Sequence, residues 1–169
     1  MNATEFLRQR VYGYAELDGD EHAAIQEFTL LWSAFEGALL GTEASPAGLL
    51  SVAHELKDRG QLDMGRFAEP LAYFQNRYWR NGEFTAEYSG LRVEKFKRKS
   101  DQSLVQQALG GAALPPEAVL GALLLVVYRL RNNLFHGVKW AYGIRGQRTN
   151  FVQACAVLMA VMELSGGAE

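Results

Sequence analysis

The chain has 169 residues, of which 49% are hydrophobic and 21% are charged, and its formal net charge is −2. This length and composition predict one soluble globular domain, 1–169, with a hydrophobic core of its own. They argue against a membrane-spanning segment, which needs about 20 apolar residues without charge, and against a protein that covers nucleic acid with its whole surface.

Helical patterns account for most of residues 1–82. A short helix is predicted first, and each of three longer helices has a recognisable starting signal. The signals are the turn and cap Asp18-Gly19-Asp20, the cap Ser45 followed by Pro46 at a first helical position, and the cap Asp63. The expected helices cover 2–12, 21–40, 46–59 and 64–80, and the last is expected to end near Asn81-Gly82.

Residues 83–99 follow no helical period. Apolar residues alternate with polar ones at Phe84, Ala86 and Tyr88, and again at Leu91 and Val93. Alternation is typical of strands, so a small hairpin or an extended insertion is predicted at about 83–99. The basic run that ends this stretch forms either a solvated edge or a surface for a polyanion. It consists of Lys95, Lys97, Arg98 and Lys99.

The second half of the chain is also helical in pattern. Ser100 is expected to cap a short helix, and Pro115-Pro116 opens the longest apolar pattern of the chain. That helix is expected to be buried nearly all round, with Gly137 at its C-cap. After a loop, Thr149 is expected to cap a last helix. Four long helices and several short ones predict an all-α fold, an antiparallel helical bundle.

Charge is distributed unevenly along the chain. Residues 118–162 contain five basic and no acidic side chains, whereas the remainder contains 12 basic and 19 acidic ones. The five basic residues are Arg129, Arg131, Lys139, Arg145 and Arg148. A local positive face on an acidic body favours a site for anions.

The long apolar helix ends in a cluster of polar residues, among them Arg131, Asn132 and His136. Asn132 and His136 are four residues apart and share a helix face, so Asn132 is expected to hydrogen-bond the imidazole and orient it. Arg131 lies about 140° from His136 around an ideal helix. For both to serve one site, Arg131 must reach around the helix or the backbone must loosen near Gly137.

These residue types suit the cleavage of RNA without a metal. Histidine exchanges protons near neutral pH, and the unpaired carbonyls at a helix C-terminus favour a protonated ring at His136. The planar guanidinium of Arg131 matches a pair of phosphate oxygens. The 2′-hydroxyl of the RNA would attack the adjacent phosphate and leave a 2′,3′-cyclic phosphate and a 5′-hydroxyl. DNA, which lacks that hydroxyl, is expected to survive.

The sequence Arg-Asn-Asn-Leu-Phe-His-Gly at 131–137, with Lys139 and Trp140 just beyond it, resembles the catalytic motif of HEPN ribonucleases. The specific match covers about 115–142. Residues 31–36, Leu-Trp-Ser-Ala-Phe-Glu, are a weaker match to the first core helix of that family. The resemblance implies a helical bundle that dimerises so that two motifs meet in one cleft. It also implies a metal-independent endoribonuclease, commonly of a toxin–antitoxin or antiviral defence system.

By position, the resemblance assigns Arg131 and His136 as the catalytic pair and Asn132 as the supporting polar residue. Three further residues are substrate-binding candidates, each with an alternative: Lys139 as a phosphate contact or a solvated side chain, Arg129 as a phosphate contact or a dimer anchor, and Glu36 as a polar partner or an exposed charge. RNA, a second copy of the chain and an antitoxin or regulatory protein are the implied partners.

No cofactor or metal is expected, because the three histidines lie on separate segments and no paired-cysteine or His-Glu-x-x-His spacing occurs. Cys155, the single cysteine, lies among small apolar residues and is expected to be a buried, inert thiol. A lone cysteine also favours a reducing compartment, the cytoplasm. The alternative function is a non-catalytic module of the same fold that binds nucleotide, RNA or a partner protein.

Overall fold

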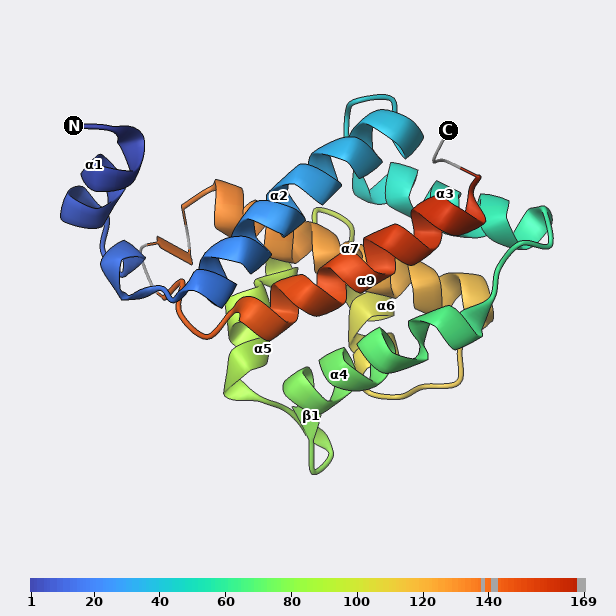
Figure 1. Cartoon of the computed structure of the whole chain (residues 1–169). Coiled ribbons are helices and arrows are strands. Elements are labelled where there is room, and N and C mark those ends of the chain that lie inside the picture. Colours follow the sequence, from blue (N-terminus) through green and yellow to red (C-terminus); the bar gives the residue numbers. More distant parts are fainter. Residues whose placement is uncertain (138, 141–142, 167–169) are drawn as a thin grey trace.

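The structure, a computed structural model, describes residues 1–137, 139–140 and 143–166. These residues form eight α-helices and one small two-stranded sheet, so the all-α fold is confirmed (Figure 1). Val138, Ala141 and Tyr142, which belong to the loop expected before the last helix and to the stretch that resembles the ribonuclease motif, lie outside the described residues. The helices are α1 (Ala3–Arg10), α2 (Gly19–Leu39), α3 (Pro46–Asp58), α4 (Ala68–Tyr78), α5 (Ala86–Leu91), α6 (Lys99–Leu109), α7 (Pro116–Phe135) and α9 (Arg148–Leu164).

Helices α2 and α3 begin at the capping residues that the sequence predicts. The Asp18 carboxylate accepts from the Glu21 N–H at 2.8 Å, and the Glu21 carboxylate accepts from the Asp18 N–H at 3.1 Å. This reciprocal capping box satisfies two backbone donors at the start of α2. Ser45 caps α3 by accepting from the Gly48 N–H at 3.0 Å, and Pro46 occupies the first helical position.

The helix expected over 64–80 is shorter than predicted and has two parts. Asp63 caps a 3₁₀ turn, Met64–Phe67, and α4 follows it and ends at Tyr78. Asn81 and Gly82, expected to end a helix, instead form the turn of a hairpin, with φ of 53° and 79°. Two successive left-handed residues are what a tight hairpin turn requires, and Asn-Gly provides them.

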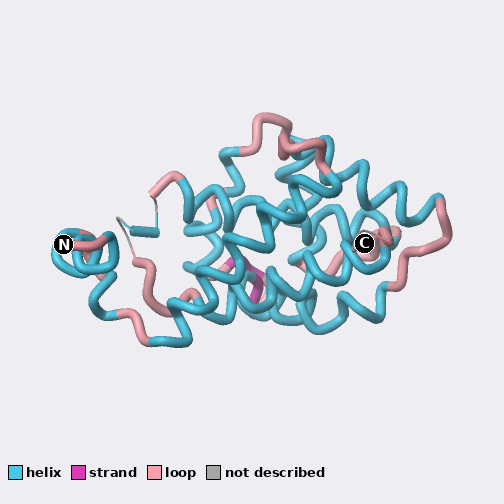
Figure 2. The backbone as a smooth tube through the Cα atoms, turned by 45° about the horizontal axis from the view of Figure 1, so that its top comes forward, coloured by secondary structure: helices cyan, strands magenta, loops and turns pink. Residues whose placement is uncertain are grey.

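The prediction of a hairpin or extended insertion over 83–99 is therefore wrong in its position. The hairpin joins β1 (Trp79–Arg80) to β2 (Glu83–Phe84) and lies mostly before that stretch (Figure 2). The rest is helical: α5 and a 3₁₀ turn, Val93–Lys95, follow the hairpin. The apolar residues that alternate there, Leu91 and Val93, are both buried because Arg92 between them adopts a left-handed conformation, φ 59°.

Two of the predicted caps are also wrong. Arg98, rather than Ser100, is the N-cap of α6, and Gln147, rather than Thr149, is the N-cap of α9. Neither cap side chain accepts a hydrogen bond from a backbone N–H of the first turn, although each bonds a side chain there: Arg98 donates to Asp101, and Gln147 accepts from Asn150. Serine and threonine are common caps, but a fold can begin a helix one or two residues earlier when tertiary contacts hold its first turn.

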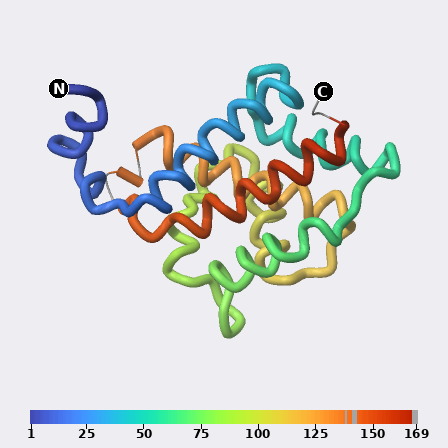
Figure 3. The backbone as a smooth tube through the Cα atoms, viewed as in Figure 1, coloured from blue at the N-terminus to red at the C-terminus, as the bar shows by residue number. Residues whose placement is uncertain are grey.

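Helix α7 forms the centre of the molecule, and its residues from Leu120 to Val127 are all buried. It runs antiparallel to α3, whose C-terminal Lys57 bonds Glu117 at the start of α7 at 2.6 Å. Helices α2 and α9 lie side by side on another face of α7 and run in the same direction (Figure 3). Phe28 of α2 stacks on Phe151 of α9, with ring centroids 5.1 Å apart. The bundle is thus antiparallel around α7 and contains one parallel pair.

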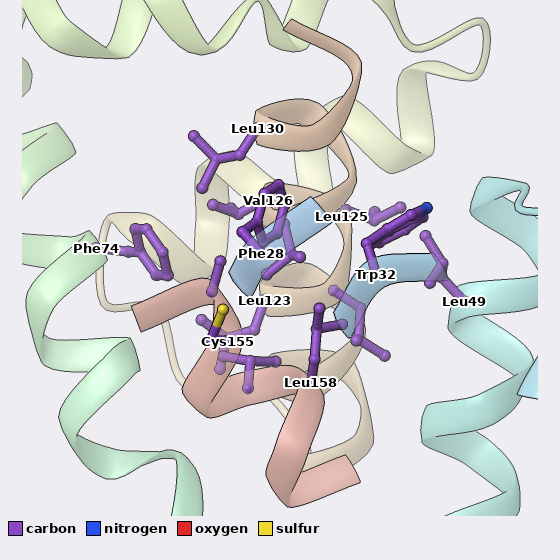
Figure 4. Packing of buried hydrophobic residues seen from close by; sticks show 14 of the residues in the cluster. Phe28, Trp32, Leu49, Phe74, Leu123, Leu125, Val126, Leu130, Cys155 and Leu158 are labelled. Atoms are coloured by element: carbon purple, nitrogen blue, oxygen red, sulfur yellow. The ribbon is translucent and has the colours of Figure 1, made fainter. Parts of the chain in front are cut away.

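The core explains the apolar character of α7. By length and composition alone this helix could cross a membrane, but 72% of its apolar window is buried inside the protein. Figure 4 shows Leu123, Leu125 and Val126 of α7 packed between side chains of the neighbouring helices. Cys155 of α9 belongs to the same cluster, and burial raises the pKa of its thiol to about 11. The prediction of a buried cysteine is confirmed.

Candidate functional site at the end of helix α7

Arg131 is held in place by aromatic rings and by its neighbour. Its guanidinium carbon lies 4.9 Å from the ring centre of Phe135, one turn further on, and 5.8 Å from that of Trp32 on α2. Its Nη1 donates to the Asn132 side-chain oxygen at 2.9 Å. No carboxylate of the described residues lies within ion-pairing distance of it. The positive charge of Arg131 is therefore oriented but not neutralised.

Asn132 serves Arg131 rather than His136. Its side chain is only 8% exposed, and the amide oxygen accepts from the Arg131 guanidinium. The expected hydrogen bond to the His136 imidazole is absent from the described contacts, so that prediction is corrected. The two residues meet through the backbone instead, where the His136 N–H donates to the Asn132 carbonyl at 2.9 Å.

His136 lies directly after α7, as its C-cap, and its side chain is exposed. Gly137 follows with φ 75°, the left-handed conformation that ends many helices. Phe135 beside it is 49% exposed, which is unusual for so large an apolar ring. In the part of the chain that the structure describes, no hydrogen bond joins the His136 imidazole to Arg131 or Asn132. The histidine is thus accessible and free to turn toward a ligand.

Arg129 points to the opposite face and holds a neighbouring helix. Its Nε donates to the Leu91 carbonyl at 3.2 Å, and its Nη2 donates to the Asn133 side-chain oxygen at 3.0 Å. The Asn133 amide donates to the carbonyls of Gly90 and Leu91 at 3.1 and 3.2 Å. These two α7 side chains therefore cap the C-terminal end of α5, and burial lowers the pKa of Arg129. We call Arg129 and Asn133 the α5 clamp.

Lys139 and Glu36 lie in different surroundings. Lys139 is half-buried, and burial together with the nearby charge of Arg77 lowers its pKa. The Glu36 carboxylate accepts from the Ala44 N–H at 3.0 Å and so fixes the turn between α2 and α3. Glu36 is neither a freely exposed charge nor in a described contact with Arg131. Its contact positions the first turn of α3.

A cleft of about 420 Å³ opens beside the end of α7. It lies between one face of α7, the N-terminus of α3 and the basic run, for which the sequence leaves open a solvated edge or a surface for a polyanion. Helix α7 contributes Tyr128, Asn132 and part of the buried Arg129 to its lining, and the basic run contributes Lys95, Lys97 and Arg98. We call this the basic cleft. Asn132 is the link between the two regions, because it lines the cleft and also bonds Arg131.

The cations of the basic cleft are only partly neutralised. Arg98 pairs with the buried carboxylate of Asp101 at 3.2 Å. Lys95 and Lys97 are exposed and form no ion pair within the described residues. Lys99 belongs to the same run but does not line the cleft. The run is therefore divided between a cleft wall and a solvated surface.

The positive face expected from residues 118–162 is smaller than predicted. Arg145 and Arg148 pair with carboxylates near the start of α2, at 2.8 and 3.7 Å, and Arg129 is buried. Arg129, Arg131 and Lys139 form no ion pair among the described residues, and of these three only Arg131 and Lys139 are not buried. The positive charge lost there is replaced by Lys95, Lys97 and Arg98, which come from another part of the sequence.

Sequence reasoning missed the aromatic support of the site and the position of the basic run. Trp32 was noted only as part of a core-helix resemblance, although its ring holds the Arg131 guanidinium. Its signal was the spacing on α2, where Trp32, Phe28 and Phe35 share the buried face. No local signal places Lys95 beside Asn132, because this proximity depends on how α5 packs on α7.

No group of three or more histidine, cysteine, aspartate or glutamate side chains suited to a metal occurs among the described residues. Comparisons with protein-family models, with curated proteins and with solved structures find no match to this chain. The resemblance to HEPN ribonucleases therefore stays a prediction that depends on residues 131–137 and their surroundings.

Proposed function

We propose that this protein is a metal-independent endoribonuclease of the HEPN type, which acts in the cytoplasm as a homodimer. One observation carries the proposal: an oriented, unneutralised Arg131 and an exposed His136 lie at the same helix end, and Asn132 connects Arg131 to the basic cleft. A phosphodiester is the ligand that such an arrangement suits, since a guanidinium and nearby lysines bind phosphate oxygens.

The reaction needs only groups of the protein and the RNA. The 2′-hydroxyl attacks the adjacent phosphorus as His136 accepts its proton, and Arg131 stabilises the negative charge that gathers on the phosphate oxygens. The bond to the 5′-oxygen breaks, and that oxygen takes a proton from the protonated His136 of the second copy in the shared cleft. The products are a 2′,3′-cyclic phosphate and a 5′-hydroxyl. Asn132 holds the Arg131 guanidinium and touches no reacting atom.

The exposed ring of Phe135 supports the dimer. It lies between Arg131 and His136 in the sequence, and its apolar surface gains from burial against a second copy. A two-fold axis at this position brings two copies of His136 into one cleft. The same surface suits a defence role, in which an antitoxin or regulatory protein controls access to the site.

The test is an RNA cleavage assay with purified protein, a mixture of tRNA and mRNA, and EDTA in excess. Cleavage is expected to survive EDTA and to fall at least a hundredfold in His136→Ala and in Arg131→Ala. His54→Ala, which removes an exposed histidine on α3, is the matched control and is expected to keep full activity. The 3′ ends of the products are expected to carry a cyclic phosphate.

Two results would contradict the proposal. Cleavage that EDTA abolishes would point to a metal-dependent mechanism, and undiminished cleavage by both alanine variants would remove these residues from the site. The dimer has its own test: an excess of His136→Ala subunits, mixed and re-equilibrated with wild type, is expected to lower wild-type activity. Unchanged activity in that mixture, with subunit exchange verified, would contradict a shared site.

A non-catalytic module is the second candidate, and one observation favours it. In the described residues the His136 imidazole contacts neither Arg131 nor Asn132, so the pair is not assembled as it stands. A binding module predicts that RNA binds with an affinity that depends on Arg131, yet is never cut. Expression toxicity separates the two candidates, since growth arrest that requires His136 is expected only of the ribonuclease.

A further inference from the structure

The basic cleft has the size of a small-ligand site and one flat aromatic wall. Its volume of about 420 Å³ lies within the range of pockets that hold ligands as large as a nucleotide. The half-buried Tyr128 ring forms part of that wall. The Phe96 ring, which also lines the cleft, lies at a centroid distance of 6.4 Å from the Tyr128 ring with an interplanar angle of 16°, and the Trp32 ring lies at 6.1 Å. Tyr128 is thus a supported ring on which a flat base can stack.

The basic cleft is also lined by cationic side chains. Lys95 and Lys97 are exposed and unpaired within the described residues, whereas Arg98 shares its charge with Asp101. The first turn of α3, which includes Ser45, lines the same cleft with the positive end of a 13-residue helix. The cleft therefore combines an aromatic ring with positive charge. A nucleotide has a flat base that suits the ring and a phosphate that suits the charge.

Asn132 provides a polar group at the inner end of the cleft. More than nine-tenths of this residue is buried, and its side-chain oxygen is already used by Arg131. Its Nδ2 amide donates to no protein acceptor in the described part of the chain. A ligand oxygen or base edge in the cleft would accept a hydrogen bond from this amide.

We propose that the basic cleft is the subsite for one unpaired nucleotide of the RNA strand whose phosphodiester lies at Arg131 and His136. This inference rests on the proposed function and names its substrate class: single-stranded RNA. The base lies against Tyr128 and meets the Asn132 amide, and its phosphate lies on Lys95 and Lys97. A base inside an A-form duplex is paired and stacked on both faces, so it cannot occupy such a cleft.

The test measures binding rather than cleavage, in the full-length His136→Ala protein. The probe is a fluorescein-labelled six-nucleotide single-stranded RNA, titrated by anisotropy at fixed salt. The double variant Lys95→Glu/Lys97→Glu is expected to weaken binding at least tenfold. Tyr128→Leu, which removes the stacking ring, is expected to weaken it about tenfold. The control Lys99→Glu reverses one charge of the same run outside the cleft, half the charge change of the double variant, and is expected to stay within about twofold.

Competition experiments distinguish single-stranded RNA from duplex RNA and from free mononucleotides as the ligand of the cleft. A hairpin duplex that contains the same six nucleotides is expected to compete at least tenfold less well than the single strand. Adenosine or uridine monophosphate is expected to compete only at far higher concentration, because neither reaches Arg131 from the cleft. A monophosphate as effective as the hexanucleotide would overturn the proposal and assign the cleft to a free nucleotide. Equal competition by the duplex would also overturn it.

The lysine variants decide the result if Tyr128→Leu fails to fold, because Lys95 and Lys97 are exposed and their replacement leaves the core intact. Equal weakening by Lys99→Glu and by Lys95→Glu/Lys97→Glu would overturn the subsite. The failure of the proposed function looks different. If wild type never cleaves RNA but binding depends on the cleft, the ribonuclease is wrong and the nucleotide subsite stands. If wild type cleaves RNA and the cleft variants cleave and bind normally, the ribonuclease stands and the nucleotide subsite is wrong.

Discussion

At the scale of single residues, the side chains that carry the chemistry are few and their partners decide what they do. Arg129 and Arg131 are two positions apart on α7, yet one caps α5 from a buried position and the other presents its charge beside an exposed histidine. The sequence identified Arg131, Asn132 and His136 as candidates from type and spacing alone. It assigned Asn132 the wrong partner, because spacing on an ideal helix cannot foresee that the Arg131 guanidinium reaches that amide oxygen first.

The charge of Arg131 is expected to be essential, and Asn132→Asp tests this without changing the shape of the side chain. The new carboxylate still accepts the hydrogen bond from Arg131 but neutralises the guanidinium and places a negative charge in the basic cleft. RNA cleavage, measured as kcat/KM, is expected to fall about tenfold or more. Asn76→Asp, on the exposed surface of α4, is the control. Full activity in Asn132→Asp would show that the charge of Arg131 is not used.

At the scale of elements, helix starts with an obvious cap were predicted correctly, and junctions that depend on tertiary packing were not. Asp18 and Ser45 cap α2 and α3 as expected. The Asn81-Gly82 pair is the strongest short signal for a hairpin turn, but it was assigned to the end of a helix because the apolar spacing before it is helical. The fold of α5 had no such signal, since its C-terminal carbonyls are satisfied by side chains of α7.

The α5 clamp is expected to stabilise the protein rather than to bind RNA. Arg129→Met keeps most of the apolar volume but removes one of the two donors to the Leu91 carbonyl and leaves the Asn133 amide oxygen without its buried donor. The free energy of unfolding is expected to fall by about 1–3 kcal/mol. Urea denaturation followed by circular dichroism measures it. A variant with unchanged stability and weakened RNA binding would instead return Arg129 to the substrate-binding residues.

The contact between α3 and α7 is expected to make stability depend on acid pH. The hydrogen bond from Lys57 lowers the pKa of Glu117 below its usual 4.5. Above pH 4.5 the carboxylate is ionised in both states and the pair stabilises the fold. As the pH falls toward the lowered pKa, the unfolded chain takes up the proton first, and that stabilisation is lost. The Tm difference between wild type and Glu117→Gln is therefore expected to shrink from pH 7 to pH 3. A constant difference would contradict this.

At the scale of the whole molecule, fold class followed from the sequence because apolar periodicity is a property of each helix taken alone. The arrangement of the helices did not follow, and neither did the basic cleft. Its walls come from α7, the start of α3 and the segment around Lys95, which are far apart in sequence. The positive face predicted from the charge count of residues 118–162 is also smaller than expected, because Arg145 and Arg148 pair with acidic residues more than one hundred positions away.

The core is expected to protect its single cysteine until the protein unfolds. Burial raises the pKa of Cys155 to about 11, so at pH 8 the thiol is both covered and protonated. An aromatic disulfide reagent, which releases a yellow thiolate when it reacts with a protein thiol, is expected to label the native protein slowly and the protein in urea fully. The labelled fraction is expected to follow the unfolding transition seen by circular dichroism. Rapid labelling of native protein would show that α9 opens independently of the bundle.

The α5 clamp has a further consequence for how RNA is positioned. It anchors the chain at Leu91, only a few residues before Lys95 and Lys97, and it does so from the same helix that carries Arg131. The α5 clamp thereby sets the separation between the two lysines and the Arg131 guanidinium, although the clamp itself does not contact the RNA. A one-residue insertion after Arg92 should change the register between the two contact points, and with it the preferred cut position.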